Sequence, residues 1–479
     1  MYDNYETVIG LETHIQLSTK SKAFSGDAVQ FGSEPNRHIS PITLAYPGTL
    51  PKANREQVQF AVRLGLALGC EINLENRFDR KNYFYADLPK GYQTTQDRLP
   101  ICVGGQVPIT VNGKTKYIRI HHIHMEEDAG KSIHDIDPKH SLIDLNRAGT
   151  PLLEVVSEPD LRSGEEVDAF MSTMQQLVRY LEISDGNMEQ GSLRCDCNIS
   201  VRKVGETEYG TRCEVKNMNS MRFARQAIKF ETKRQIDLIK SGGEVKQQTL
   251  NFDPATGTTS PLRSKEDAHD YRYFPEPDLP PIRLTKAEIE SIKTELPALP
   301  WAIKEQLMEQ YQLSDSDATT LTTERATAEY AQDFLAACPH AKAASNLMIQ
   351  LLLPNLKKGE QLSELPLTIK QLCEFIELIQ TDKISNSVAY QQLFPALLKQ
   401  PKSSPSQLAE ELNLLQSEDA DFLTPIIDSI LANNPDKVKA YQKGKKGLIG
   451  FFMGELMKQS KGKANPKVAK GRLEEALKK

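Results

Sequence analysis

Alternating apolar and polar residues dominate the first part of the chain. In ETVIGLETHIQL (6–17) the alternation has a period of two, as in a strand with one buried face. The same alternation recurs in YIRIHHIHME (117–126) and in the pair of segments that flank Asn112-Gly113. Short segments of this kind, separated by turn residues, predict a strand-rich domain.

Two longer segments of the same region have the period of helices. RSGEEVDAFMSTMQQLVRYL (162–181) repeats apolar residues along one stripe, and Ser163 with Glu166 predicts a capping box at its start. A second helix is predicted from about Ser220 to the stop signal SGG (241–243). Its basic stripe either follows the phosphates of an RNA or forms a solvated face, and both interpretations stay open at this point; the stripe comprises Arg222, Arg225, Lys229 and Lys233.

The later part of the chain changes to helical patterns. Of the 27 glycines, 20 precede residue 285, and the proline-dense PEPDLPPI (275–282) can continue neither a helix nor a central strand. A softer boundary lies at KQPKSSPSQ (399–407), and Asn465-Pro466 predicts the N-terminus of a last helix. We therefore predict an α+β fold: a strand-rich domain over residues 1–293, an all-α connector over 294–403 and a small all-α tail over 404–479.

Composition narrows the class of protein. The 479 residues are 39% hydrophobic and 26% charged, and no apolar run approaches the roughly 18 residues of a membrane-spanning helix. The N-terminus, MYDNYE, lacks the basic and apolar regions of a secretory signal. The seven cysteines are few and odd in number, which favours a reducing compartment over a disulfide framework. We expect a cytoplasmic protein that does not meet a membrane.

Charge is unevenly distributed. From Lys437 to the end, 13 Lys or Arg residues stand against three Glu, a balance of +10, although the whole chain carries −5. A basic tail on an acidic body suggests that the tail meets a polyanion, and a solvated lysine face is the alternative.

The stretch HHIHMEEDAGKSIH (121–134) concentrates four of the nine histidines. As a strand it places His122, His124 and Glu126 on one face and His121 on the other, so the histidines cannot all bind one ion. AGKS resembles the end of a phosphate-binding loop, but position 125, where that loop needs glycine, is Met125. One or two of the carboxylates remain as candidate ligands of a hard cation such as Mg²⁺.

Three other segments carry candidate chemistry. Glu12 and His14 share a strand face about 7 Å apart and suit a metal or a proton transfer, or else an ordinary polar face. FDRKNYFYADLPKGYQ (78–93) mixes basic and aromatic residues, which suits phosphate contact and base stacking, or simple packing of tyrosines. The cysteines of the third segment lack a fourth zinc ligand and are expected to be buried packing residues; they are Cys195, Cys197 and Cys213.

Together these segments resemble the B subunit of the tRNA-dependent amidotransferases. The matching stretches follow the family's order through nearly the whole chain: VIGLETHIQL, FDRKNYFYADLPKGYQ, HMEEDAGKS, DLNRAGTPLLEVVSEPD, GSLRCDCNIS, VKNMNS, DYRYFPEPD and GFFMGELMKQSKGKANP. The resemblance implies a catalytic domain called the cradle, a helical connector and a tail. It also implies a ligase that forms a carbon–nitrogen bond: ATP phosphorylates the side-chain carboxylate of Glu-tRNA(Gln) or Asp-tRNA(Asn), and ammonia then amidates it.

The resemblance further implies partners and site residues. A glutaminase A subunit would release the ammonia, and a small C subunit would complete the heterotrimer. By motif, the metal and catalytic set is Glu12, His14, Glu127 and Glu154, with His14 either a ligand, a contact through water or a base. Lys81 and Lys90 would contact ATP phosphates or the ammonia path, and Tyr83 would join them in binding ATP.

Two regions outside this set complete the expectations. Many relatives hold zinc with cysteines where this chain has Ser25, Asp27, Ser40 and Thr43, so we expect ATP and Mg²⁺ but no structural zinc. The residues expected to meet tRNA phosphates lie in the tail; they are Lys461, Lys463, Lys467, Lys470 and Arg472.

Two alternatives come from other classes of function. One is a non-catalytic scaffold that binds tRNA for another subunit. The other is a carboxylate–amine ligase that acts on a small metabolite, for which the basic tail has no evident use. The residues also leave open whether Glu-tRNA(Gln), Asp-tRNA(Asn) or both are substrates.

Overall fold

The computed structural model describes residues 4–218, 220–263, 271–416, 420–460 and 464–478. The chain forms two compact units, Met1–Trp301 and Ala302–Lys479. The first unit combines a large sheet with helices and the second is helical, so the predicted α+β class is confirmed. The predicted end of the first domain at residue 293 lies shortly before the end of this unit.

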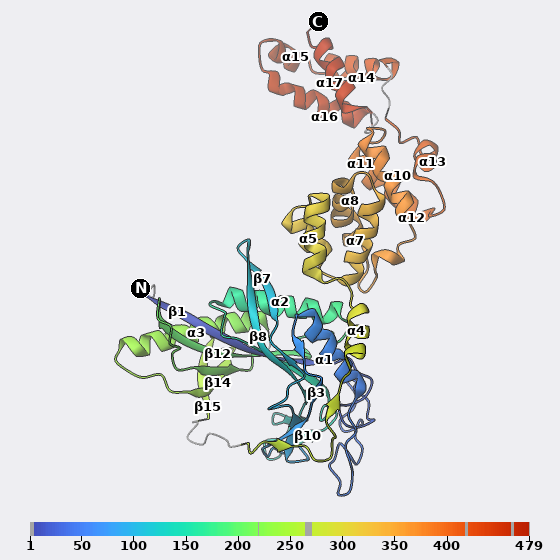
Figure 1. Ribbon diagram of the computed structural model, residues 1–479. Helices are drawn as coiled ribbons and strands as arrows, with labels where there is room; N and C mark the ends of the chain where they lie inside the picture. The colour runs from blue at the N-terminus through green and yellow to red at the C-terminus, as the bar shows by residue number, and fades with distance from the viewer. Residues whose placement is uncertain (1–3, 219, 264–270, 417–419, 461–463, 479) are drawn as a thin grey trace. The chain divides into compact units, whose positions relative to one another are not determined.

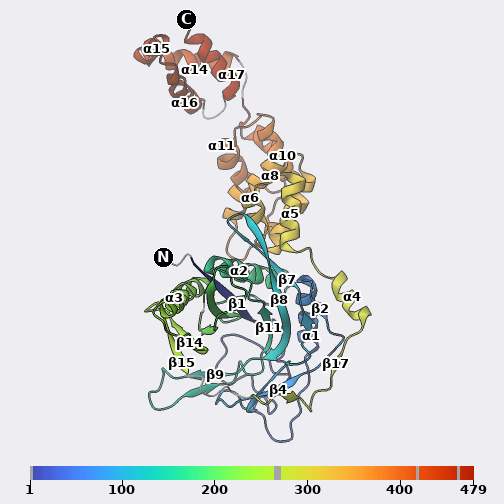
Figure 2. The same cartoon turned by 60° about the vertical axis from the view of Figure 1, so that its left-hand side comes forward.

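The first unit is built on a sheet that has ten strands within the described residues. Its centre is β1 (Tyr5–Gln16), which pairs antiparallel with β12 (Leu193–Lys203) on one side (Figure 1) and with β11 (Pro151–Ser157) on the other (Figure 2). Next to β11 lies β8 (Lys114–Glu127). The other strands are β13 (Cys213–Lys216), β14 (Gln248–Asp253) and β15 (Thr258–Arg263) beyond β12, and β6 (Cys102–Val103), β2 (Glu71–Ile72) and β7 (Gln106–Val111) beside β8.

Alternation along β1 sets the two faces of the sheet. Leu11 and Ile15 are buried in the hydrophobic core, whereas Glu12 and His14 are half-buried on the opposite face, as predicted. Cys195 and Cys197 of β12 join the core face as well, and their predicted role as packing residues is confirmed. Three helices contribute to this core, and Figure 2 shows them around the sheet: α1 (Arg55–Ala67), α2 (Gly164–Tyr180) and α3 (Met221–Lys240).

The predicted helix after Ser163 is α2, and its apolar stripe is fully buried. Ser163 accepts a hydrogen bond from the Glu166 amide at 3.2 Å, as expected for an N-cap. The Glu166 carboxylate instead accepts from the Arg162 amide at 2.8 Å and from Lys116 Nζ at 2.8 Å. Only half of the predicted capping box forms, because these donors occupy the carboxylate that would close it.

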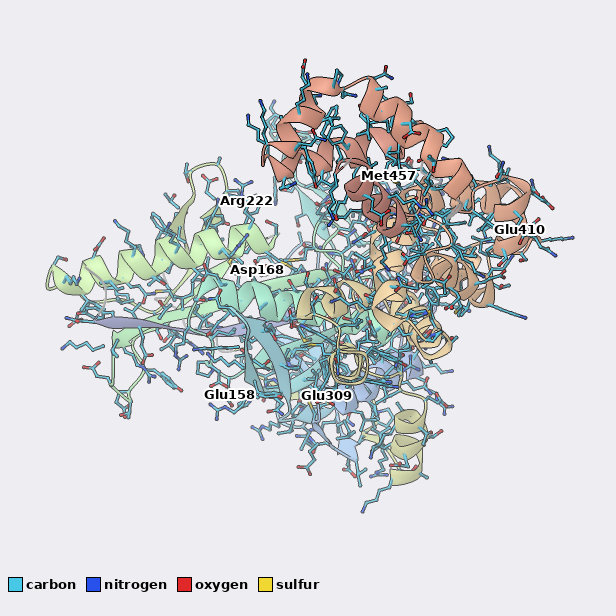
Figure 3. The ribbon with its side chains drawn as sticks, turned by 90° about the horizontal axis from the view of Figure 1, so that it is seen from above. Glu158, Asp168, Arg222, Glu309, Glu410 and Met457 are labelled. Carbon is cyan, nitrogen blue, oxygen red and sulfur yellow. The ribbon has the colours of Figure 1, made fainter. Side chains whose placement is uncertain are left out.

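The predicted helix after Ser220 is α3, and its basic stripe is exposed. Figure 3 labels Arg222 on α3 and Asp168 on the neighbouring α2. Asp168 lies 3.3 Å from Arg225, and Lys233 pairs with Asp237 at 3.2 Å. Acidic side chains therefore face two of the four cations, and both interpretations of the stripe stay predictions.

A smaller sheet lies beside the face of the large sheet that carries Glu12 and His14. β4 (Asp79–Asn82), β5 (Tyr92–Thr95) and β16 (Phe274–Pro275) make a three-stranded sheet. Gln93 of β5 donates to the Glu127 carbonyl at 2.8 Å, which ties this sheet to the end of β8. The unit is completed by β9 (Lys131–Ile133) with β10 (Leu142–Asp144), β3 (Glu75–Asn76) with β17 (Ile282–Arg283), and α4 (Lys286–Thr294).

The second unit is helical throughout its described residues. Asn465 caps its last helix by accepting from the Lys467 amide at 3.0 Å, with Pro466 following it as predicted. The helices, with short π and 3₁₀ turns between some of them, are α5 (Pro300–Tyr311), α6 (Asp315–Leu321), α7 (Arg325–Ala337), α8 (Ala341–Leu347), α9 (Leu353–Asn355), α10 (Ile369–Gln380), α11 (Asn386–Val388), α12 (Phe394–Lys399), α13 (Pro405–Glu411), α14 (Ala420–Ala432), α15 (Pro435–Gln442), α16 (Ile449–Gln459) and α17 (Pro466–Ala476).

A division of this unit into connector and tail stays a prediction. The last four helices share a hydrophobic cluster that runs from Leu423 to Leu477. By contrast, Ser404 at the start of α13 donates to Glu374 of α10 at 2.8 Å, so α13 contacts the predicted connector. Among the described residues, no helix is long and apolar enough to cross a membrane.

Candidate active site

The polar face of the sheet aligns titratable side chains across three strands. In the register of β1 and β11, His14 lies opposite Glu154, and in that of β11 and β8, Glu154 lies opposite His124. Glu126 follows His124 by two residues and therefore shares its face. The antiparallel pairing thus gathers residues from distant parts of the chain at one point.

Three of these residues form what we call the histidine–carboxylate cluster: His14, Glu126 and Glu154. His14 Nε2 lies 3.4 Å from Glu154 Oε2 and 3.6 Å from Glu126 Oε1. One ligand atom from each residue lies within 4.8 Å of the other two, which suits a single metal ion. Two carboxylates and one imidazole fit a divalent cation that prefers oxygen ligands, such as Mg²⁺ or Mn²⁺.

His124 supports this cluster from β8. Its Nε2 lies 3.1 Å from Glu154 and 3.5 Å from Glu126. Burial alone would lower the pKa of His124, but Glu154 and Glu126 raise it to about 10. Burial would likewise lower the pKa of His14, and Glu154 raises it. Both imidazoles in turn hold the pKa of the half-buried Glu154 well below its usual range, against the effect of burial.

The other histidines of this stretch extend away from the cluster. His122 Nε2 lies 3.1 Å from His124 Nδ1, and His121 is exposed beyond it. Burial and the neighbouring imidazoles lower the pKa of His122 to about 4. As the strand pattern predicted, the four histidines do not converge on one ion.

Beside this cluster lies a second group, the acidic cluster of Glu12, Asp196 and Glu214. It lies on β1, β12 and β13, and Asn198 donates to Glu12 at 2.9 Å. Burial and the nearby Glu154 and Glu214 raise the pKa of Glu12. Lys216 Nζ lies 2.8 Å from both Asp196 and Glu214, so an ammonium group already offsets part of the negative charge.

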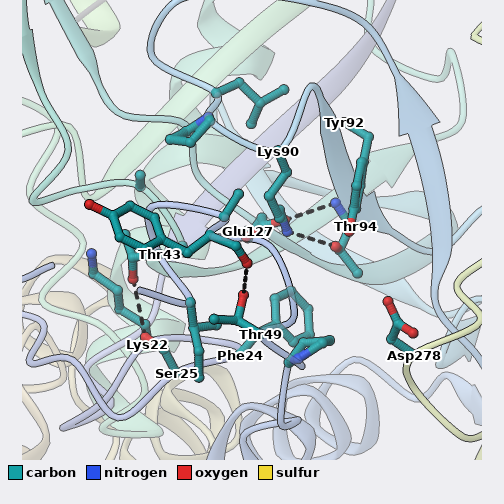
Figure 4. A pocket seen from close by; sticks show the side chains of 18 of the residues that line it. Lys22, Phe24, Ser25, Thr43, Thr49, Lys90, Tyr92, Thr94, Glu127 and Asp278 are labelled. Carbon is teal, nitrogen blue, oxygen red and sulfur yellow. Dashed lines mark hydrogen bonds and ion pairs between the residues drawn. The ribbon is translucent and has the colours of Figure 1, made fainter. Parts of the chain in front are cut away.

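Glu127, which the resemblance placed among the metal ligands, lies apart from both clusters. Its carboxylate pairs with Lys90 and accepts from the Thr94 amide at 2.9 Å. It lines a cavity of about 220 Å³ to which neither cluster contributes. Figure 4 shows Glu127 there, with Lys90 and Thr94 beside it. The structure therefore brings Glu154 together with His14 and places Glu12 beside them, but it brings in Glu126 rather than Glu127.

The two lysines of the predicted site, Lys81 and Lys90, line different cavities. Lys81 lines a cavity of about 330 Å³ that includes the histidine–carboxylate cluster, together with Tyr83. Lys81 Nζ lies 4.8 Å from the ring centroid of Tyr271 and 5.9 Å from that of Tyr83. Lys90 instead lines the cavity of Glu127, with its Nζ 5.0 Å from the ring of Tyr92. We call these the Lys81 cavity and the Lys90 cavity; Asp128 lines both.

Two of the four positions at which many relatives carry zinc-binding cysteines, Ser25 and Thr43, line the Lys90 cavity. Ser25 Oγ donates to Asp27 at 2.9 Å, and the Thr43 hydroxyl donates to the same carboxylate oxygen. Burial would raise the pKa of Asp27, but hydrogen bonds from Thr43 and Ser25 lower it. These residues form a hydrogen-bonded group of oxygen atoms, and the absence of a structural zinc stays a prediction.

The predicted tRNA contacts fall partly outside the described residues, which exclude Lys461 and Lys463. Lys467 is 82% exposed and pairs with Asp382 at 2.5 Å. Lys470 is exposed and Arg472 is half-buried. Lys467 would have to exchange its carboxylate partner for a phosphate to contact RNA.

Sequence patterns contained part of the information on the clustered residues that the resemblance does not name. Alternation along the strand already places Glu126 on the same face as His124. The pattern does not show that Glu154 of β11 lies opposite His124, because this depends on the register between the two strands. Asp196 and Glu214 gave no such signal, because their partners lie on strands far away in the chain.

Comparison with known proteins shows the family of the chain. Residues 7–290, which carry both clusters, match a family described as the GatB/GatE catalytic domain, so the first unit belongs to this class of catalytic domain. Residues 329–477 match a second family, described as the GatB domain.

Full-length relatives identify the family more closely. A protein of Geobacter sulfurreducens is 47% identical over 479 residues, covering 99% of this chain and all of the relative. Proteins of Solidesulfovibrio magneticus and Thioalkalivibrio sulfidiphilus are 46% identical, each over 99% of both chains. All three are named as the B subunit of an aspartyl/glutamyl-tRNA(Asn/Gln) amidotransferase. The chain belongs to this family of amidotransferase B subunits, and the resemblance drawn from its motifs is confirmed.

Proposed function

We propose that this chain carries the ATP-dependent step of a tRNA-dependent amidotransferase. Its substrate is the side-chain carboxylate of Glu-tRNA(Gln), Asp-tRNA(Asn) or both, and the reaction is that of a ligase with glutamine as the amido donor. The observation that carries the proposal is the Lys81 cavity. There, two carboxylates and an imidazole that can share a metal ion lie beside cations that can bind phosphate.

The chemistry requires activation because a carboxylate is a poor electrophile. A carboxylate oxygen attacks the γ-phosphorus of ATP, the bond to the β-phosphate oxygen breaks, and ADP leaves with the electron pair. Ammonia then attacks the carbonyl carbon of the acyl phosphate, inorganic phosphate leaves, and the ammonium-like nitrogen of the intermediate loses a proton. Mg²⁺, when bound, would neutralise the crowded phosphate oxygens.

The residues of the Lys81 cavity have separable roles in this proposal. His14, Glu126 and Glu154 would hold the metal ion, and Glu12 with the acidic cluster offers a second group of cation ligands beside it. Lys81 would contact phosphate oxygens, and Tyr83 would pack against the nucleotide, as the motif resemblance implies. His124 would keep both carboxylates oriented by donating to them.

The Lys90 cavity is the proposed entry for ammonia. It is about 220 Å³, and Asp128, one of its lining residues, also lines the Lys81 cavity. Ammonia must arrive neutral, so a protected route from a glutaminase A subunit is expected, with a small C subunit completing the complex. A cytoplasmic location, tRNA binding by the tail and the absence of a structural zinc belong to the same proposal.

Replacing Lys90 by methionine is therefore expected to uncouple the two nitrogen sources. Glutamine-dependent amidation should fall at least about tenfold, because the variant removes the hydrogen bonds of Lys90 to Glu127 and Thr94, and loss of a charged hydrogen bond costs about 1.5 kcal/mol or more. Amidation with saturating free ammonia should change little. The double variant K90M/E127Q, which removes the unpaired carboxylate, serves as the control for folding. An equal loss with both nitrogen sources would contradict the assignment of this cavity to ammonia delivery.

The function itself is tested with the complex reconstituted from purified subunits. We expect amidation of each misacylated tRNA with free ammonia to require ATP and to release ADP and phosphate in equal amounts. A scaffold that only binds tRNA would leave this activity to another subunit, so cluster variants of this chain would then retain it. A ligase for a small metabolite would consume ATP without tRNA. Either result would overturn the proposal.

A further inference from the structure

Arg194 lines the Lys81 cavity, and most of its hydrogen-bond donors have no acceptor among the described residues. It lies on β12 directly opposite His14 of β1, so it borders the histidine–carboxylate cluster. Its Nη2 donates to Asp128 Oδ2 at 2.9 Å. A guanidinium has five N–H donors, and within the described residues only this one has an acceptor.

The contact with Asp128 fixes the guanidinium in place. Asp128 is 5% exposed and accepts a second hydrogen bond from Gln16 at 2.8 Å, while Arg147 Nε lies 3.6 Å away. An arginine held by a buried carboxylate loses little freedom when it binds a further anion.

The remaining donors lack a partner in the free chain. The Nε atom of Arg194 is buried with no hydrogen-bond acceptor among the described residues, while the side chain as a whole is 34% exposed. Leaving a buried donor unsatisfied costs about 1–3 kcal/mol, so such a group indicates a missing acceptor. Lys216, in the same cavity, differs because two carboxylates already pair with it.

An anion with several oxygens would satisfy this arrangement. The planar guanidinium matches two oxygens of a phosphoryl group, whereas Lys81, which lines the same cavity, offers a point charge. A chloride ion, with a single acceptor atom, would leave most of these donors without a partner.

We propose that Arg194 is a further catalytic residue, whose guanidinium binds the phosphoryl group during its transfer from ATP to the substrate carboxylate. The inference rests on the proposed function. In this step the new bond joins the carboxylate oxygen to phosphorus and the bond to ADP breaks, so negative charge spreads over the transferred oxygens. Donors fixed beside those oxygens stabilise the transition state more than the ground state.

The competing interpretation is that Arg194 serves only to neutralise Asp128. The variant Arg194→Lys separates the two, because an ammonium group can still pair with Asp128 but cannot bind two phosphoryl oxygens. Arg202→Lys is the matched control: Arg202 lies on the same strand and the same face, pairs with Glu6 at 2.7 Å and lies outside the cavity.

The test uses the complete complex with Mg²⁺ and measures two quantities. The first quantity is the affinity of the complex for ADP with beryllium fluoride, which imitates the terminal phosphoryl group, divided by its affinity for ADP alone. The second is the rate of ATP cleavage in a single turnover with misacylated tRNA. We expect Arg194→Lys to reduce the affinity ratio about tenfold and cleavage about 100-fold, with unchanged affinity for ADP. Arg202→Lys should match the wild type in both.

Each alternative outcome is decisive. Wild-type values for Arg194→Lys in both measurements would overturn the inference and leave the proposed function intact. Equal loss of affinity for ADP and for its beryllium fluoride complex would show that Arg194 maintains the cavity rather than binding the phosphoryl group. Absence of tRNA-dependent ATP cleavage in the wild type would overturn the proposed function and this inference together.

Discussion

Replacing Glu126 by glutamine is expected to reduce ATP-dependent amidation with free ammonia at least about 1,000-fold, because a bound metal ion supplies several kcal/mol of transition-state stabilisation. Glu126 lies on the face of the sheet that carries His14 and Glu154. Glu127→Gln should stay within about tenfold of the wild type in the same assay, since that carboxylate meets Lys90 and the Thr94 amide instead and loses only one charged hydrogen bond.

Glutamine keeps the size of glutamate, so both variants should assemble with their partner subunits, which size-exclusion chromatography can establish. The pair of variants also distinguishes the motif resemblance, which places Glu127 in the metal set, from the geometry, which places Glu126 there. A larger loss for Glu127→Gln than for Glu126→Gln would contradict the site as described.

Ending the chain after Gln416 should weaken tRNA binding and make it less dependent on salt. This removes the cluster of the last four helices but keeps α13, which contacts α10 through Ser404 and Glu374. If the five predicted tail residues each meet one phosphate, the negative slope of log K against log salt concentration should become shallower by about 4. Affinity at physiological salt should fall at least about tenfold for the same reason.

Glutamine hydrolysis by the partner subunit should continue in this truncated complex, and its rate is the control for assembly. Binding is measured by filter retention or fluorescence anisotropy over a series of salt concentrations. An unchanged salt slope would show that the basic tail is a solvated face, which is the alternative left open by its charge.

Sequence patterns predicted those parts of the fold that depend on local periodicity. The two faces of β1, the helices α2 and α3, and the capped start of α17 all follow from alternation, a 3.6-residue repeat or a cap residue. The capping box at Ser163 formed only partly, because Arg162 and Lys116 compete for the Glu166 carboxylate. That competition depends on tertiary contacts, which a local pattern does not contain.

The candidate site depends on register between strands, which sequence patterns do not supply. Glu126 and Glu127 are neighbours in the chain, yet the alternation of a strand sends their carboxylates to different cavities. Arg194 gained significance only through its position opposite His14 and its contact with Asp128. Composition likewise gave no sign of the acidic cluster, whose members lie on three separate strands.

The most direct test of the site is to locate the metal ion. A crystal structure of the complex with Mn²⁺ and a non-hydrolysable ATP analogue would reveal the ion by its anomalous scattering. The account predicts a peak between His14, Glu126 and Glu154, with the terminal phosphate of the nucleotide in the Lys81 cavity. A nucleotide-bound ion beside Glu127 and Lys90, with none at the histidine–carboxylate cluster, would contradict it.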